Sequence, residues 1–241
     1  MSDIGIKLIY WDRVLEAGFW ILLTLFFYYL ALRIQQALGG TPLANPVLLA
    51  SAPIIALLVA ADIWVGDYMG GGQALIWLLG PATVGLAVPL YRNFACVRSA
   101  LVPMAVSLAV GSAVAVLSAV LIGDAMGASL ETVRSLAPKS VTTPIAMGIA
   151  EEIGGYASLT AAFVIITGII GAAFGSMFFN LCRIGDARAR GFAMGIAAHG
   201  IGTARAFQED EVSGTFSGAA MALNGIVTAL VLPLLWLAFA G

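Results

Sequence analysis

Charged residues are scarce in this sequence. They make up 10% of its 241 residues, whereas hydrophobic residues make up 61%, and the mean hydropathy is +1.01. A soluble domain of this length would carry roughly a quarter charged residues. Too little polar surface is therefore available to cover a core in water. The shortage excludes a soluble globular domain and predicts an integral membrane protein.

Several functional classes are excluded by what else is missing. The net charge of −2 is spread thinly, with no basic stripe, so no nucleic-acid partner is expected. A single histidine and two cysteines without a CxxC pattern give no ligand set for a metal or other cofactor. The motifs GxSxG, HExxH and GxxxxGK[ST] are absent, so the chain is not expected to be an enzyme.

The hydrophobic runs predict a chain of membrane helices. At roughly 20 residues per crossing, the length suits about seven to eight segments. Residues 1–16 read as an amphipathic lead-in at the headgroup level, and residues 17–241 as a single transmembrane domain. The glycines at 70–72 predict a hinge or turn. Unbroken helices are predicted over 17–38, from Pro46 to about 65, and over 99–123, 157–181 and 212–240.

Two segments, about 73–91 and 127–150, are apolar but broken by proline. The sequence around the first break, 79–84, resembles that around the second, 136–141. Arginines precede the helix at 99–123 and follow the helix at 157–181, so the positive-inside rule gives the two units opposite orientations. The predicted fold is an all-α polytopic membrane protein with an inverted repeat of two discontinuous or re-entrant elements. Whether 73–91 and 191–207 span the membrane or re-enter is left open.

Broken helices in a membrane favour a binding site at the break. Unpaired backbone groups in hydrocarbon cost several kcal/mol each, so an interruption survives only where protein or water satisfies it. The second half of a broken helix also begins with free N–H groups that suit an anion. Lys139 is the only lysine after Lys7, and a lysine in an apolar segment marks a functional site unless it snorkels to the surface. The candidate substrate-binding residues at the breaks are Thr83, Lys139, Ser140, Thr142 and Thr143.

Further polar residues follow the second break. Glu151 and Glu152 are candidate proton carriers if a semi-buried site raises a carboxyl pKa, and otherwise form a pair facing water. His199, Thr203 and Arg205 lie in a glycine-rich segment and could supply further donors or a gate. The simpler alternative for His199 is a structural hydrogen-bond donor.

Blocks of sequence around these candidates resemble the LrgB/CidB family. The most specific blocks are Pro-Lys-Ser within 138–147 and Ala-His-Gly-Ile-Gly-Thr within 198–206, and further similarity covers 78–91, 153–155 and 167–172. Members of that family are described as regulators of murein hydrolase export that work with a small holin-like partner of the LrgA/CidA type. Plant relatives are similar to plastidial glycolate/glycerate translocators, and bacterial relatives are linked to pyruvate and other small monocarboxylates.

The resemblance implies a carrier of a short 2-hydroxy or 2-oxo acid in the bacterial inner membrane, coupled to protons or exchange. A homodimer is expected because a moving part needs a fixed scaffold, which the helices at 17–38 and 212–240 would supply. The alternative is a non-transporting, holin- or antiholin-like regulator of murein hydrolase export and cell lysis. A pore would show a polar stripe along one helix, whereas the polar residues here cluster at breaks.

Overall fold

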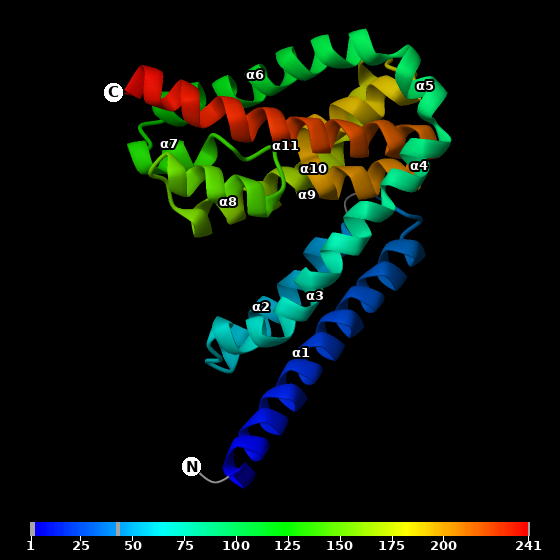
Figure 1. Cartoon of the computed structure of the whole chain (residues 1–241). Coiled ribbons are helices and arrows are strands. Elements are labelled where there is room, and N and C mark those ends of the chain that lie inside the picture. Colours follow the sequence, from blue (N-terminus) through cyan, green and yellow to red (C-terminus); the bar gives the residue numbers. More distant parts are fainter. Residues whose placement is uncertain (1–2, 42–43, 241) are drawn as a thin grey trace. The chain divides into compact units, whose positions relative to one another are not determined.

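A computed structural model describes the main chain of residues 3–41 and 44–240, and the side chains of these residues outside 3–13, 79, 82–83 and 239–240. Every regular element in this part of the chain is a helix, which confirms the predicted all-α class (Figure 1). The helices are α1 (Asp3–Ala37), α2 (Pro46–Ala60), α3 (Val65–Gly85), α4 (Ala87–Arg92), α5 (Phe94–Ser99), α6 (Leu101–Ala125), α7 (Leu130–Leu136), α8 (Thr143–Glu152), α9 (Ala157–Leu181), α10 (Ala187–Glu209) and α11 (Glu211–Ala240).

Four helices are long and apolar enough to cross a membrane. They contain the segments Val14–Ala37, Leu101–Ala125, Ala157–Leu181 and Glu211–Ala238, and the shorter α2 is also apolar. Large apolar side chains of α6, among them Val102, Val106 and Leu121, are exposed on the protein surface. A bilayer accepts such a surface, whereas water does not. The chain is therefore a membrane protein, as its composition predicted.

The chain divides into two compact units, Met1–Ala87 and Val88–Gly241. In the first unit, α1 packs against α2 and α3. Trp20, Ile54 and Leu58 form its buried core, and α1 is continuous from Asp3, so the expected lead-in is part of the first helix. The start of α2 is as predicted, because Pro46 occupies its first turn and Asn45 caps it by accepting a hydrogen bond from the Val47 N–H at 2.9 Å.

Two predictions in this unit are wrong. The glycines at 70–72 are not a hinge but part of α3. A Cβ on Gly71 would lie 2.7 Å from the Ala17 carbonyl oxygen, so this glycine permits close packing of α3 on α1. The break expected at Gly80-Pro81 is absent, because α3 continues through Pro81 and the helix is interrupted only at Leu86. The proposed pairing of 79–84 with 136–141 as two breaks therefore fails.

The second unit holds α4 to α11 and the polar residues discussed below. Its helices agree closely with the sequence, since α9 has the predicted bounds and α6 and α11 differ from theirs by one or two residues. In Figure 1, α11 lies beside α6 and α8, and its most extensive contacts are with α10. Phe192 of α10 and Phe216 of α11 pack with Met104 of α6 in the core between these helices.

The first hairpin of this unit consists of α7, the connection 137–142 and α8. It starts and ends near the same end of α9, because the Tyr156 N–H, which follows α8, donates to Ser135 Oγ of α7 at 2.7 Å. Its tip, 137–142, lies deep in the unit. Asn224, near the middle of α11, donates from Nδ2 to the Ser140 carbonyl at 3.2 Å. Residues 137–142 are therefore an interruption between two short helices, and the chain turns back on itself there.

The second hairpin is α10 itself. A straight helix would place Arg190 and Glu209 about 28 Å apart, yet their side chains form an ion pair at 3.4 Å. The chain reverses at His199, whose φ of 42° and ψ of −132° are not helical. Residues 187–198 and 200–209 therefore run back along each other, with Gly202 beside Met194. The segment 191–207, which the sequence left open, thus contains a reversal of the chain direction at His199.

Candidate functional site

A cavity of about 990 Å³ lies in the second unit. It follows α6 from Ser99, which precedes the helix, to Ala115 near its middle, and α10 from Arg188 to Ala197. Apolar side chains, including those of Phe192 and Ile196, form most of its wall. Its polar lining residues are Ser99, Ser107, Lys139, Ser140, Thr167, Asp186 and Arg188.

Lys139 and Ser140, at the tip of the first hairpin, both line this cavity. Lys139 is half-buried, and its ammonium donates to Ser140 Oγ at 3.3 Å. No carboxylate lies within ion-pair distance of Lys139 among the side chains that the structure describes. A cation removed from water without a counter-ion is costly unless an anion joins it. The predicted pair thus occupies the tip of the first hairpin with a charge available to a ligand.

Asp186 and Arg188 line the cavity from the start of α10, outside the membrane spans. Their side chains form an ion pair at 2.7 Å, and each is 47% exposed. The hydrogen bonds from the Arg188 side chain, and then from its main-chain N–H, lower the pKa of Asp186 to about 2. Asp186 therefore stays ionised at physiological pH and neutralises Arg188. Lys139 contributes the net positive charge of the cavity wall.

His199 and Thr203 do not line the cavity but form the tip of the second hairpin. The His199 ring is buried, and its Nε2 donates to the Val164 carbonyl at 2.9 Å. Gly168 leaves room for this ring, since a Cβ there would lie 2.8 Å from His199 Cε1. Thr203 Oγ1 donates to the His199 carbonyl at 2.8 Å and also bonds Ser217 Oγ at 2.9 Å. These contacts fit the structural alternative for His199 and compensate its strained main chain, which costs of order 1–3 kcal/mol.

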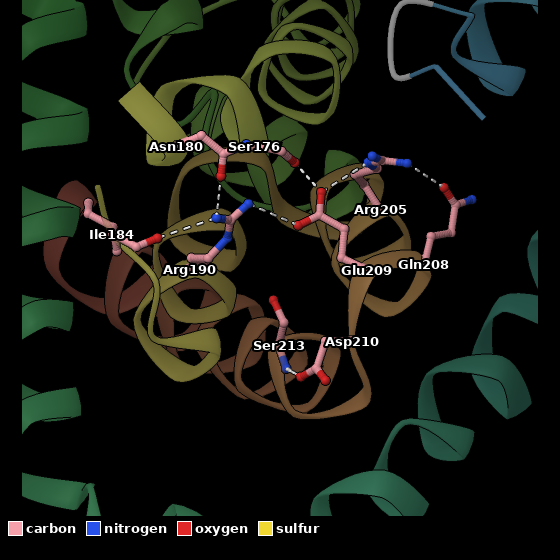
Figure 2. Close-up of polar contacts among 9 residues, drawn as sticks. All are labelled: Ser176, Asn180, Ile184, Arg190, Arg205, Gln208, Glu209, Asp210 and Ser213. Carbon is pink, nitrogen blue, oxygen red and sulfur yellow. Dashed lines mark hydrogen bonds and ion pairs between the residues drawn. The ribbon is translucent and has the colours of Figure 1, made fainter. Parts of the chain in front are cut away.

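Arg205 also lies away from the cavity, in a group of side chains at the base of the second hairpin (Figure 2). Its Nε is 3.2 Å from Glu209 Oε1. Glu209 in turn pairs with Arg190 and accepts a hydrogen bond from Ser176 Oγ of α9. The Glu209 carboxylate thus joins both helical arms of the hairpin base to α9. Arg190 also donates to Asn180 Oδ1 at 2.7 Å. We call Ser176, Asn180, Arg190, Arg205 and Glu209 the base cluster.

The remaining candidate residues are dispersed. Thr142 and Thr143 are half-buried at the start of α8, where the Thr142 side chain makes no capping hydrogen bond. Glu151 and Glu152 are exposed at the end of α8, in a position unlike the semi-buried site considered for them. Thr83 belongs to α3 in the other unit, at no helix break, and its side chain lies outside the described residues.

Asn224, which joins the two hairpins, was not among the predicted site residues. It is 1% exposed, and its amide bonds Ser140, Ile196 and Ser112, which belong to the first hairpin, the second hairpin and α6. An asparagine in the middle of a long apolar helix was the available signal, because a buried amide needs several partners. Glu209, which pairs with two arginines, was not among the predicted site residues either.

The family model described as the LrgB-like family matches residues 24–238. The chain belongs to the LrgB family. The protein YwbG of Bacillus subtilis is 40% identical over 191 residues, which cover 79% of this chain and 85% of that protein. A protein of Staphylococcus epidermidis named holin-like protein CidB is 35% identical over 231 residues, covering 95% of this chain and 99% of the relative.

A Staphylococcus aureus protein with the same name is 34% identical over 224 residues, covering 93% of this chain and 97% of the relative. No solved structure matches the chain at a significant level. The family that the sequence resemblance predicted is therefore confirmed, and the chain is a bacterial membrane protein of that family.

Proposed function

We propose that this LrgB-family protein is a secondary transporter of small monocarboxylates, such as glycolate, glycerate or pyruvate. The observation that carries the proposal is a cavity lined by Lys139, on the tip of the first hairpin, where no carboxylate among the described side chains lies within ion-pair distance of it. Discontinuous helices at the middle of a membrane unit are typical of substrate sites in carriers. The hydroxyl of Ser140 beside the ammonium of Lys139 adds a hydrogen-bonding group for a carboxylate.

The charge of the cavity wall favours an anion with a single charge. Asp186 neutralises Arg188, which leaves Lys139 to balance the substrate. A second carboxylate would enter a wall with no cation to pair with it, and desolvating that charge would cost several kcal/mol. The main-chain ends add to the preference, because α8 starts at the first tip and residues 200–209 start at the second, so the positive ends of both helices point inward.

We further infer an inverted repeat that differs from the one expected. α6 followed by the first hairpin would form one unit, and α9 followed by the second hairpin would form the other. If the arginine-rich connections face the cytoplasm, α6 runs outward and α9 inward, and the hairpins enter from opposite sides. Alternating access would then come from movement of one repeat relative to the other.

Coupling and assembly belong to the same proposal. Glu151 and Glu152 remain the candidate proton carriers, since carboxylates that face the aqueous phase in one state can take up protons there. A homodimer, and a small holin-like partner of the LrgA/CidA type, are proposed from the family resemblance. Glu151→Gln and Glu152→Gln would each leave uptake down a substrate gradient intact but remove its stimulation by an inward proton gradient.

The test is uptake of radiolabelled glycolate and pyruvate by liposomes that contain only the purified protein, with and without an inward proton gradient. Saturable uptake that is stimulated by the gradient is expected. A complete lack of uptake of either acid, with the protein shown to be folded by its circular dichroism and elution volume, would refute the proposal.

A second candidate function is a non-transporting regulator of murein hydrolase export and cell lysis. The observation that favours it is the name of the staphylococcal relatives, holin-like protein. Such a regulator needs no saturable site, so its activity in a lysis assay would survive replacement of Lys139 by glutamine. A carrier would lose uptake with the same substitution.

A further inference from the structure

The amide of Asn224 uses all its hydrogen-bonding capacity inside the second unit. Its Nδ2 donates to the carbonyls of Ser140 at 3.2 Å and Ile196 at 3.3 Å. Its Oδ1 accepts from Ser112 Oγ at 2.6 Å and from Thr228 Oγ1 at 3.4 Å. Two donors and two acceptors are what one amide offers. A buried polar network that is satisfied in this way holds its members in one arrangement.

Both carbonyls held by Asn224 lie beside chain reversals. Ser140 is in the tip 137–142 of the first hairpin, outside any helix. Ile196 precedes the reversal at His199, where the helical hydrogen-bond ladder of α10 is interrupted. Carbonyls at such positions within a membrane need another donor, because each unpaired group costs several kcal/mol. Asn224 supplies this donor to both hairpins.

Ser140, in the first tip, and Ile196, in α10, both also line the cavity. One amide nitrogen bonded to both residues fixes how far apart they are. Ser140 in turn holds the ammonium of Lys139. We propose that Asn224 is a positioning residue, which sets the width of the cavity at Lys139 by tying the two hairpins together. The inference deepens the carrier function proposed above.

Ser112 orients this amide. Its hydroxyl donates to Oδ1 and so keeps the NH₂ group toward the two carbonyls. A flipped amide would bring oxygen against two carbonyl oxygens. Ser112→Ala removes the orienting bond alone and is expected to act in the same direction as Asn224→Asp, to a smaller extent. Asn224→Asp keeps the size and both acceptor bonds but removes the donors.

The experiment compares Asn224→Asp, Ser112→Ala and the control Ser118→Ala in liposomes. Ser118 lies on the same helix as Ser112, but its hydroxyl bonds only the Ala115 carbonyl of that helix. We expect the KM for pyruvate to rise about tenfold in Asn224→Asp, which loses two hydrogen bonds, and about threefold in Ser112→Ala, which loses one. The maximal rate per folded protein should be nearly unchanged in both variants. A lower maximal rate with the KM of the wild type would show that the amide serves the fold alone and would overturn the proposal.

A second readout does not depend on transport. Lys139→Cys is introduced after Cys96→Ser and Cys182→Ser, and the rate of its alkylation by N-ethylmaleimide is measured in each background. When the hydrogen bonds from Asn224 to the two hairpins are lost, the reagent should reach the cysteine more easily. The alkylation rate should rise by about fivefold or more for the loss of about 1 kcal/mol of hydrogen bonding. Equal rates in the Asn224→Asp, Ser112→Ala and Ser118→Ala backgrounds would overturn the inference. If the wild type takes up no carboxylate, the proposed function fails while this arm still decides the role of Asn224.

Discussion

The two hairpins of the second unit reverse direction in different ways. The first turns over residues 137–142 and carries at its tip Lys139, a cation with no ion-pair partner among the described side chains. The second turns at His199, and the polar groups at its tip bond one another and α9. Its cations, Arg190 and Arg205, lie at the base and share Glu209 (Figure 2).

This difference separates two tasks. A group whose hydrogen bonds are satisfied internally stabilises the protein but has little left for a ligand. The second hairpin therefore has a structural role as a rigid part of the cavity wall. The first hairpin supplies the group that binds the ligand. The predictions below test this division, beginning with the largest expected effect.

Replacing the free cation should abolish most of the activity. A hydrogen bond to a charged group contributes about 1.5–3 kcal/mol, so Lys139→Gln is expected to lower kcat/KM for pyruvate uptake by about 10- to 150-fold. The temperature of thermal unfolding in detergent should be unchanged or higher, because a half-buried charge without an ion-pair partner is removed. Lys139→Arg keeps the charge and should retain part of the uptake. Full activity of Lys139→Gln would place the binding group elsewhere.

Breaking the base cluster should affect stability more than substrate affinity. Glu209→Gln leaves Arg190 and Arg205 without their shared carboxylate, and these side chains are only 18–21% exposed. A loss of about 1–3 kcal/mol of unfolding free energy is expected, between the values for exposed and buried pairs, and it would be measured by thermal unfolding in detergent. Asp210→Asn, next to it in sequence but outside the cluster, is the control. An increased KM with unchanged stability would contradict the division of tasks.

The packing of the second tip against α9 can be tested with a methyl group. Gly168→Ala would place a Cβ 2.8 Å from both the His199 ring and Ile201 Cδ1. The resulting overpacking should cost about 1–3 kcal/mol. Gly148→Ala, where no atom lies within 4 Å of the new Cβ, should be neutral or stabilise α8 by up to about 1 kcal/mol. Equal melting temperatures for the two variants would show that the ring does not hold this position.

The sequence predicted the first hairpin but not the second. Prolines in 137–144 and an isolated lysine marked the first break, because proline removes a helical hydrogen bond and the charge is conspicuous in an apolar run. The reversal at His199 depends on one residue with positive φ, a conformation that histidine adopts more often than most residues but that the local sequence does not specify. Its stability comes from partners distant in sequence, Val164 and Ser217.

The opposite error occurred at Gly80-Pro81. Glycine and proline together favour a break in isolation, yet α3 continues through them. Membrane helices tolerate proline where neighbouring groups compensate the lost hydrogen bond. Arg205 is a second case in which the residue type alone does not decide the outcome, here for the binding site. An arginine beside a histidine favours anion binding by type, but Glu209 one turn later, at i+4, occupies it.

The smallest expected effect concerns Arg188, whose charge is neutralised by Asp186 in the cavity wall. Removing the charge of Asp186 would leave the guanidinium of Arg188 without a counter-ion. Asp186→Asn keeps the cap of α10, since asparagine accepts the Arg188 N–H as aspartate does, but leaves the Arg188 guanidinium uncompensated. An exposed pair contributes at most about 1 kcal/mol to stability, so folding should be unaffected. The extra charge should attract anions and lower the KM for pyruvate about two- to threefold at low salt, with the effect lost near 0.5 M salt.

Because the pKa of Asp186 is lowered to about 2, its carboxylate is ionised throughout pH 5–8. The difference between Asp186→Asn and the wild type should therefore be constant over this range, and any loss of affinity with pH that both proteins share must come from another group. Succinate provides the decisive comparison. If a single net positive charge selects monoanions, succinate should inhibit pyruvate uptake weakly in the wild type and more strongly in Asp186→Asn. Equal inhibition in both proteins would mean that the charge of Arg188 does not influence which anion reaches Lys139.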